Sequence, residues 1–341
     1  MMLLDDLRTA LPDGRPRVLF TDADDERVLA ALAELARLGS VRPAVLGAGA
    51  AIRGRADALH VGLAGVDVID PAALDDARRT RWAQDIATRR ALEPRVASRL
   101  VARPVATALS LLADGDVDAV VAGADSHTRD VLMACELCLA RDDERRVVSA
   151  AFVMDVRPAP LVFADCAVTP SPTADELADI ALAAAAAGEA LLGVPARVAM
   201  LSFSTHGSAA HRDVDKVVEA TAIARRRRPE LAIDGELQAD AALDVRVAAR
   251  KVIAADGGVE GGVRAAVAGH ANVLVFPDLD AANIGYKLVR ALVPAPALGV
   301  FIEGFRAPVV KLSRGSTVEE IVGTCLLHAR RRRAGPTRAA A

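Results

Sequence analysis

The sequence lacks any uninterrupted apolar run long enough to cross a bilayer, and even the Ala-rich stretch 180–192 carries Glu189. It also lacks a strong excess of either charge, because its formal net charge is −3. That balance gives no electrostatic reason to expect binding to nucleic acid. The acidic start, residues 1–7, does not have the pattern of a signal peptide. We therefore expect a cytoplasmic protein that binds neither membranes nor nucleic acid.

Cysteine is scarce, with four residues in 341. Cys135 and Cys138 form a C-x-x-C pair, but they lie within a helical apolar pattern that has no second Cys pair or His cluster near it. Apolar helix packing is the interpretation we favour for both. The sequence therefore implies no metal site.

Two nucleotide-binding motifs are missing as well. Gly47 and Gly49 are followed by Ala-Ala-Ile, so the third glycine of the dinucleotide fingerprint is absent. No Walker lysine motif occurs anywhere in the sequence. These absences argue against a nicotinamide-dependent dehydrogenase, and they imply no bound cofactor.

What is present indicates a globular α/β protein. Hydrophobic residues make up 52% and charged residues 26% of the 341 residues, which is enough apolar surface for two domain cores. Short apolar runs alternate with helical patterns in the first part, which predicts a parallel sheet. From Val147 a hairpin around 155–159 and a long Ala-rich helix capped by Thr173 are expected. The predicted strands are 17–20, 44–46, 66–69, 119–122, 147–154, 160–163, 197–201, 231–233, 272–276 and 300–302, and late helices are predicted at 281–292 and 318–330.

One polar turn stands out near the end of the chain. After a strand-like run, Ser313, Arg314 and Gly315 form a turn, and Ser316 or Thr317 can cap the helix that follows. A hydroxyl, a guanidinium and a helix N-terminus at one turn suit a phosphate or a developing oxyanion. The turn is therefore a candidate site for phosphate or acyl chemistry.

Four further segments precede this turn in a fixed order. They are Phe163-Ala-Asp-Cys-Ala-Val-Thr-Pro-Ser-Pro-Thr173, Leu201-Ser-Phe-Ser-Thr-His-Gly-Ser208, Asp234-Gly-Glu-Leu-Gln-Ala-Asp240 and Phe276-Pro-Asp-Leu-Asp-Ala-Ala-Asn-Ile-Gly-Tyr-Lys287. Together with Leu-Ser-Arg-Gly they closely resemble the phosphate acetyltransferases, a family that includes the phosphate butyryltransferases. The resemblance runs from about residue 17 to residue 322 and is densest after 147.

The resemblance implies a fold and an activity. Such enzymes are similar to the isocitrate and isopropylmalate dehydrogenases in architecture, with two α/β domains around an active-site cleft and a homodimer formed largely through the second domain. The expected first domain is 1–146 plus 296–341, and the expected inserted domain is 147–295. The implied reaction interconverts acetyl-CoA and phosphate with acetyl phosphate and coenzyme A, without a covalent enzyme intermediate. Coenzyme A would be a substrate rather than a cofactor.

The resemblance also assigns roles at the Leu-Ser-Arg-Gly turn. Ser313 would hydrogen-bond the reacting thiol or the oxyanion, and Arg314 would hold phosphate or an anion of coenzyme A. Glu320 stands where some relatives have an aspartate base. Thr317 and Glu320 also fit a capping box, in which the carboxylate has no catalytic duty. Both interpretations of Glu320 stay open.

The segment after the strand 119–122 departs from the family pattern. Relatives continue with Asp-Val-Leu-Arg, whereas this chain has Met133 in place of the arginine. Arg129 lies four residues earlier on the same helical face and is the candidate replacement. Ser126 and Thr128, in the same segment, are further candidates for substrate binding. A second expected arginine falls near Arg89 and Arg90, without a choice between them.

The remaining candidates come from the later segments. Ser204, Thr205, Gly207 and Ser208 form a small-residue loop whose backbone amides are expected to face an anion. Asn283, Tyr286 and Lys287 are expected to line the cleft from a helix. Asp165, Asp240 and Asp278 are expected to be structural.

Two other functions stay open. One is the same transfer with a longer acyl group, as in the butyryl-type relatives. The other is a non-catalytic protein that binds acyl-CoA as a sensor, an idea that Met133 and Glu320 favour.

Overall fold

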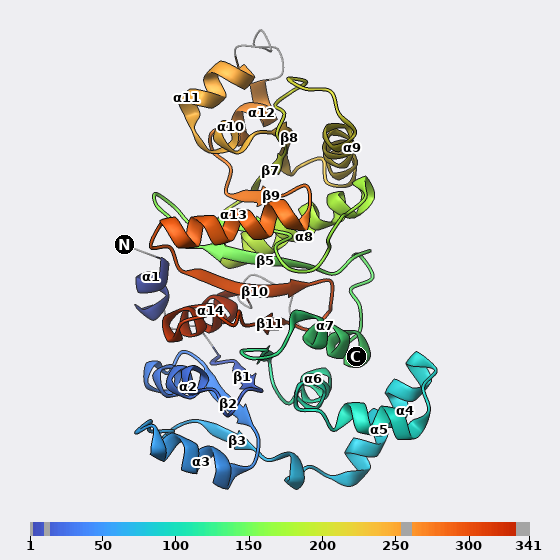
Figure 1. Cartoon of the computed structure of the whole chain (residues 1–341), viewed down its shortest axis with the longest axis vertical. Helices are drawn as coiled ribbons and strands as arrows, with labels where there is room; N and C mark the ends of the chain where they lie inside the picture. The colour runs from blue at the N-terminus through green and yellow to red at the C-terminus, as the bar shows by residue number, and fades with distance from the viewer. Residues whose placement is uncertain (1–2, 10–13, 254–260, 332–341) are drawn as a thin grey trace. The chain divides into compact units, whose positions relative to one another are not determined.

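The computed structural model describes residues 3–9, 14–253 and 261–331. The chain divides into two compact units (Figure 1). Within the described residues, unit 1 combines Leu3–Asp142 with 298–331, and unit 2 is Asp143–Ala297.

Unit 1 is a mostly parallel sheet with helices on both faces. Its strands follow the order β3-β2-β1-β4-β11-β10, and all neighbours are parallel except the antiparallel β10–β11 pair. Figure 1 shows α2 and α14 on one side of β1 and β11 and α6 and α7 on the other. The elements are α1 Leu3–Thr9, β1 Arg17–Phe20, α2 Glu26–Leu38, β2 Arg42–Leu46, α3 Gly49–Ala58, β3 Asp67–Ile69, η1 Pro71–Ala73, α4 Asp76–Arg90, α5 Pro94–Val101, α6 Pro104–Asp114, β4 Ala119–Ala122, α7 Thr128–Cys138, β10 Ala297–Glu303, β11 Val309–Lys311 and α14 Val318–Arg331.

The inner strands β1, β4 and β11 are buried on both faces, as their continuous apolar sequences predict. Val18, Leu19 and Phe20 of β1 are at most 1% exposed. Helix α2 starts where Asp25 accepts hydrogen bonds from the amides of residues 27 and 28, and it ends at Gly39 in the left-handed region. Local capping signals therefore set the helix bounds, and the apolar runs set the sheet.

Unit 2 has the strand order β5-β6-β9-β7-β8, in which only β5–β6 is antiparallel. The predicted hairpin joins β5 to β6, and Thr173 begins α8 with both hydrogen bonds of a capping box. The elements are β5 Ser149–Met154, β6 Leu161–Ala164, α8 Ala174–Leu192, β7 Arg197–Leu201, α9 Arg212–Arg227, β8 Ala232–Leu237, α10 Ala239–Leu243, α11 Val245–Ala248, η2 Ala249–Ile253, α12 Gly261–Val267, β9 Val273–Val275 and α13 Leu279–Leu292.

Helix α8 packs closely on the unit 2 sheet because its facing residues are small. A Cβ on Gly188 would lie 2.9 Å from Cγ2 of Val273 and 3.5 Å from Cγ2 of Val162, so the position has no room for a side chain. The Ala-rich sequence, which predicts a helix, thus allows close contact between this helix and the sheet. The predicted α/β fold class is confirmed.

Within the described ranges, no single helix is long and apolar enough to cross a membrane. Only α5 and α6 taken together reach that length and composition, and they are bent by 91° at their junction.

Candidate functional site

The predicted Ser-Arg-Gly turn lies at the carboxyl edge of the unit 1 sheet. Strands β1, β4 and β11 are adjacent and parallel, so the loops that follow them emerge at the same edge. The chain also passes from β1 to β2 on one side, while β4 lies on the other side. Ligands of open α/β sheets bind outside the strand ends at such a reversal of strand order. These three loops form the candidate site.

The loop after β11 is held in a compact turn. The amide of Leu312 donates to the carbonyl of Ala122 at 2.8 Å, which fixes this loop against β4. Ser316 Oγ accepts from the amide of Ser313 at 3.1 Å, and Ser313 Oγ accepts from the amide of Gly315 at 3.3 Å. Ser313 is half-buried and Arg314 is exposed. In the contact with Gly315, Ser313 Oγ is the acceptor. The hydroxyl proton of Ser313 is therefore still available for donation.

An arginine from the neighbouring loop ties this turn down. Arg27 Nη1 donates to the carbonyl of Arg314 at 2.6 Å and to the carbonyl of Ser316 at 3.0 Å. Its other terminal nitrogen pairs with Asp25 Oδ2 at 2.6 Å. Burial opposes ionisation of Asp25, but hydrogen bonds from the side chain and amide of Arg27 outweigh burial and lower the pKa of this carboxyl. The clamp is therefore a stable ion pair joined to the turn.

The loop after β4 is joined to the loop after β1. Gly123 has φ +83°, a backbone conformation that favours glycine, and its amide donates to Asp22 Oδ2 at 2.9 Å. The predicted residues Ser126, Thr128 and Arg129 follow at the start of α7, where Ser126 and Thr128 are half-buried and Arg129 is exposed.

A cavity of about 260 Å³ lies beside this segment, between α6, α7 and the end of α5. Met133, which is 41% exposed, lines it together with Ser126. The arginine that lines it is Arg103, the residue before α6, and not the expected Arg129. Its walls are otherwise mostly apolar and comprise Leu100, Pro104, Val105, Ala106, Asp130, Ala134 and Leu137. Arg103 is thus a candidate that the sequence interpretation missed.

The predicted loop of unit 2 has a different arrangement from the expected one. Each backbone amide from Ser204 to Ser208 donates to an acceptor within unit 2. The buried carboxylate of Glu236 takes two donors, the amide of Gly207 at 2.7 Å and Ser204 Oγ at 2.9 Å. Ser208 Oγ accepts the amide of Thr205 at 3.0 Å. These amides are therefore engaged within unit 2, and the role of Ser204, Thr205, Gly207 and Ser208 in binding an anion stays a prediction.

The α13 candidates are only partly presented to solvent. Tyr286 is 8% exposed and stacks on Phe152 with ring centroids 4.7 Å apart, so it is a core residue of unit 2. Asn283 Nδ2 donates to the carbonyl of Cys166 at 3.3 Å, and Lys287 is exposed. Asp278 caps α13 by accepting from the amide of Ala281 at 2.8 Å, as expected for a structural residue.

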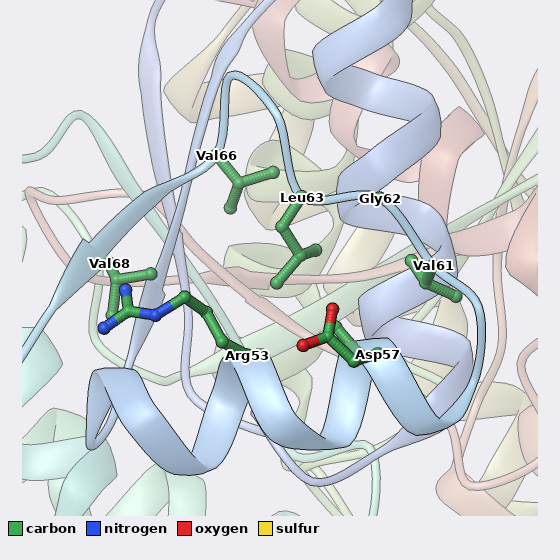
Figure 2. Close-up of a pocket in the computed structure, with 8 residues that line it drawn as sticks. Arg53, Asp57, Val61, Gly62, Leu63, Val66 and Val68 are labelled. Carbon is green, nitrogen blue, oxygen red and sulfur yellow. The ribbon is translucent and has the colours of Figure 1, made fainter.

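A second cavity, of about 280 Å³, lies between α3, β3 and the loop that joins them (Figure 2). Figure 2 shows Arg53 and Asp57 projecting from α3 beside Leu63 and Val68. One guanidinium and one carboxylate leave this cavity without net charge. It has no excess positive charge for a phosphate group, and we assign no function to it.

Among the described residues, no cluster of three or more His, Cys, Asp or Glu side chains is arranged to hold a metal ion. Burial raises the pKa of the Cys135 thiol, and it raises the pKa of Cys138 to about 11. Both thiols are therefore protonated at neutral pH, in keeping with apolar packing in α7.

Comparison with known proteins decides the family. The family described as phosphate acetyl/butaryl transferase matches residues 2–329. The chain belongs to this family. It is 37% identical over 329 residues to a phosphate acetyltransferase of Clostridium acetobutylicum, covering 94% of this chain and 96% of the relative. It is 36% identical over 317 residues to a phosphate acetyltransferase of Corynebacterium glutamicum, covering 92% of each.

Solved structures agree with this family. A phosphotransacetylase from Streptococcus pyogenes superposes with a TM-score of 0.85 at 33% identity, covering 98% of both chains. A branched-chain phosphotransacylase from Enterococcus faecalis has a TM-score of 0.66 at 18% identity, covering 93% of this chain and 98% of its own, and shows the fold alone. A chain from Salmonella typhimurium assigned to the 4-hydroxythreonine-4-phosphate dehydrogenases also shares the fold, with a TM-score of 0.56 at 15% identity over 94% of this chain. The expected likeness to dehydrogenase architecture is confirmed at the level of the fold.

In this member of the phosphate acetyl/butaryl transferases, Glu320 makes the contacts of a helix cap. Its Oε2 accepts from the amide of Thr317 at 2.9 Å, and Thr317 Oγ1 accepts from the amide of Glu320 at 3.2 Å. Both hydrogen bonds of the capping box are therefore formed at the start of α14. Glu320 is 5% exposed, so the carboxylate is directed toward the backbone rather than toward solvent.

We expect Glu320→Gln to keep kcat within about twofold of the wild type, because the amide oxygen can still accept the hydrogen bond from Thr317. Glu320→Ala should lower the free energy of unfolding by about 1 kcal/mol. Glu319→Gln, on the exposed side of the same turn, is the matched control. Steady-state rates and urea unfolding provide the measurement. A tenfold loss of kcat in Glu320→Gln with unchanged stability would assign Glu320 to proton transfer instead.

Proposed function

We propose that this chain interconverts acetyl-CoA and phosphate with acetyl phosphate and coenzyme A. The observation that carries the proposal is the clamped Ser313–Arg314 turn at the reversal of strand order in a chain of this family. Four cysteines that are buried and unpaired also fit the reducing cytoplasm, where we place the reaction.

The proposed chemistry is a direct transfer in a ternary complex. In the direction of acetyl-CoA synthesis, the sulfur of coenzyme A attacks the acyl carbon, and the thiol proton ends on the departing phosphate. The carbon–oxygen bond to phosphate then breaks, and phosphate leaves with the electron pair. No covalent bond to the protein and no bound cofactor is required.

The roles of the turn follow from its donors. Ser313 Oγ has a proton available and would donate to the oxyanion or to the thiol sulfur. The exposed Arg314 guanidinium would hold the phosphate or a phosphate of coenzyme A in a charge-assisted contact. Ser126 and Thr128 would add hydroxyl donors from the adjacent loop. Arg103 would supply the guanidinium that the sequence interpretation expected from Arg129.

Purified protein without added metal is expected to release coenzyme A from acetyl-CoA only when phosphate is present, with formation of acetyl phosphate. The double variant with Ser313→Ala and Arg314→Ala gives the background rate. Binding of acyl-CoA without turnover of acetyl-, propionyl- or butyryl-CoA would contradict the transferase and favour the sensor.

A longer acyl group is the second candidate substrate, because the cavity beside Met133 has mostly apolar walls. The same assay with acetyl-, propionyl- and butyryl-CoA separates the two. If the cavity holds the acyl chain, Met133→Arg selectively impairs butyryl-CoA. If it does not, all three substrates keep their relative rates.

We further propose a homodimer formed through the domain 147–295. Helix α13 exposes three apolar side chains at a spacing of four, which places them on one helical face: Ile284 at 58%, Leu288 at 55% and Leu292 at 80% exposure. An apolar stripe of this kind is typical of a protein contact surface.

Leu288→Glu is therefore expected to convert the dimer into a monomer in size-exclusion chromatography with light scattering, because a buried, unpaired charge opposes association. Val96→Glu, at an exposed apolar residue of α5, should leave the mass unchanged. A wild-type protein that elutes as a monomer at micromolar concentration would refute the proposed dimer.

A further inference from the structure

Lys311 is a buried lysine at the centre of the candidate site. It is the last residue of β11, pairs in register with Ala122 of β4 and is 6% exposed. Lysine is almost never buried without a partner of opposite charge. Among the described residues, however, no hydrogen bond and no ion pair within 4.0 Å engages its ammonium group. The alkyl stem of Lys311 is therefore buried, while its ammonium group has no counter-charge in direct contact.

The position of the side chain places this cation at the loop after β4. A Cβ built on Gly123 would lie 3.3 Å from Cγ and 3.2 Å from Cε of Lys311. The alkyl stem thus lies along the face of Gly123 where a larger residue would have its side chain. The ammonium is one bond beyond Cε, and so it lies at the loop that leads to Ser126 and α7.

The charged groups near Lys311 do not compensate the positive charge of its ammonium group. Burial lowers the pKa of Lys311, and the positive charge of Arg314 lowers it further. Asp22 acts in the opposite direction but more weakly. Its carboxylate already accepts hydrogen bonds from the amide of Gly123 at 2.9 Å and from Thr21 Oγ1 at 2.9 Å. An anion that entered between Lys311 and Arg314 would relieve this repulsion.

We propose that Lys311 and Arg314 together bind the phosphoryl oxygens of phosphate and acetyl phosphate. Lys311 thereby adds a phosphate-binding cation from β11 to the guanidinium groups of Arg314 and Arg103. The proposal rests on the proposed acyl transfer, in which negative charge grows on the phosphate oxygen as the carbon–oxygen bond breaks. A preorganised ammonium aimed at that oxygen stabilises the growing charge more than water does.

The test compares substrates as well as variants. Lys311→Met keeps the length of the side chain and removes the charge. It should raise KM for acetyl phosphate, and Kd for inorganic phosphate in calorimetry, by about tenfold or more. KM for coenzyme A should stay within about twofold of the wild type. Lys311→Arg should recover part of the phosphate affinity, and Lys251→Met, at an exposed lysine paired with Asp240, should change neither constant.

Three outcomes separate the alternatives. Unchanged phosphate affinity in Lys311→Met overturns the proposal. A raised KM for coenzyme A alone also overturns it, because Lys311 would then hold the other substrate. If Lys311→Met does not fold, Lys311→Gln is measured in its place. A wild-type protein that transfers no acyl group, but binds phosphate in a Lys311-dependent manner, refutes the proposed reaction and supports the phosphate site.

Discussion

Replacing Arg314 with alanine is expected to lower kcat/KM for acetyl phosphate by about 10- to 150-fold, the kinetic equivalent of about 1.5–3 kcal/mol for one charge-assisted contact. The guanidinium is exposed, and its backbone carbonyl is held by Arg27 at 2.6 Å, so the substitution removes the charge without releasing the turn. Steady-state kinetics with acetyl phosphate and coenzyme A varied separately provides the measurement.

Arg212→Ala is the control for this experiment, because Arg212 is 89% exposed at the start of α9 and lies outside the site. Arg314→Lys should recover part of the lost rate, since it restores the charge without the two-pronged geometry. If Arg314→Ala and the Arg212→Ala control had equal rates, the turn would not belong to the active site.

Replacing Asp165 with alanine is expected to cause the largest loss of stability, at least about 3 kcal/mol in the free energy of unfolding. Asp165 is 4% exposed and accepts hydrogen bonds from four backbone amides. These amides belong to Ala150, Ala167, Val168 and Thr169, at 3.2, 2.9, 3.1 and 2.8 Å. Alanine would leave all four donors without this acceptor, one of them fully buried and three half-buried, and each unsatisfied buried donor carries a desolvation cost.

Urea unfolding followed by circular dichroism measures this loss. Asp240→Ala is the matched control, because Asp240 pairs with Lys251 at the surface and such pairs contribute at most about 1 kcal/mol. Equal unfolding midpoints for the two variants would show that Asp165 does not hold its loop in this way.

Local signals in the sequence were sufficient to predict much of the fold. The apolar run of β1 and the Thr173 cap of α8 are properties of a few neighbouring residues, and both were predicted correctly. Strand ends were less well predicted, since β8 extends to Leu237 although its last residues include Gly235 and Glu236. Glu236 is polar in sequence and buried in the structure because it accepts donors from a loop about thirty residues earlier.

The same limit applies to the site. The Ser313–Arg314 turn could be found because its hydroxyl, guanidinium and helix cap are consecutive. Arg103 and Lys311 carried no local signal. Their importance comes from lying beside Met133 and Gly123, which are distant in sequence and are brought near by the sheet and the α6–α7 contact. The predicted roles of Ser126, Thr128, Arg129, Asn283 and Lys287 stay predictions.

The clamp made by Arg27 has a consequence for the entropy of binding. Because the carbonyls of both Arg314 and Ser316 are tied to α2, the turn has little conformational freedom left to lose when a substrate arrives. A larger share of the contact energy then appears as affinity rather than being spent on ordering the backbone. Through its contacts with the turn, Arg27 would thus contribute to how tightly the substrate is held.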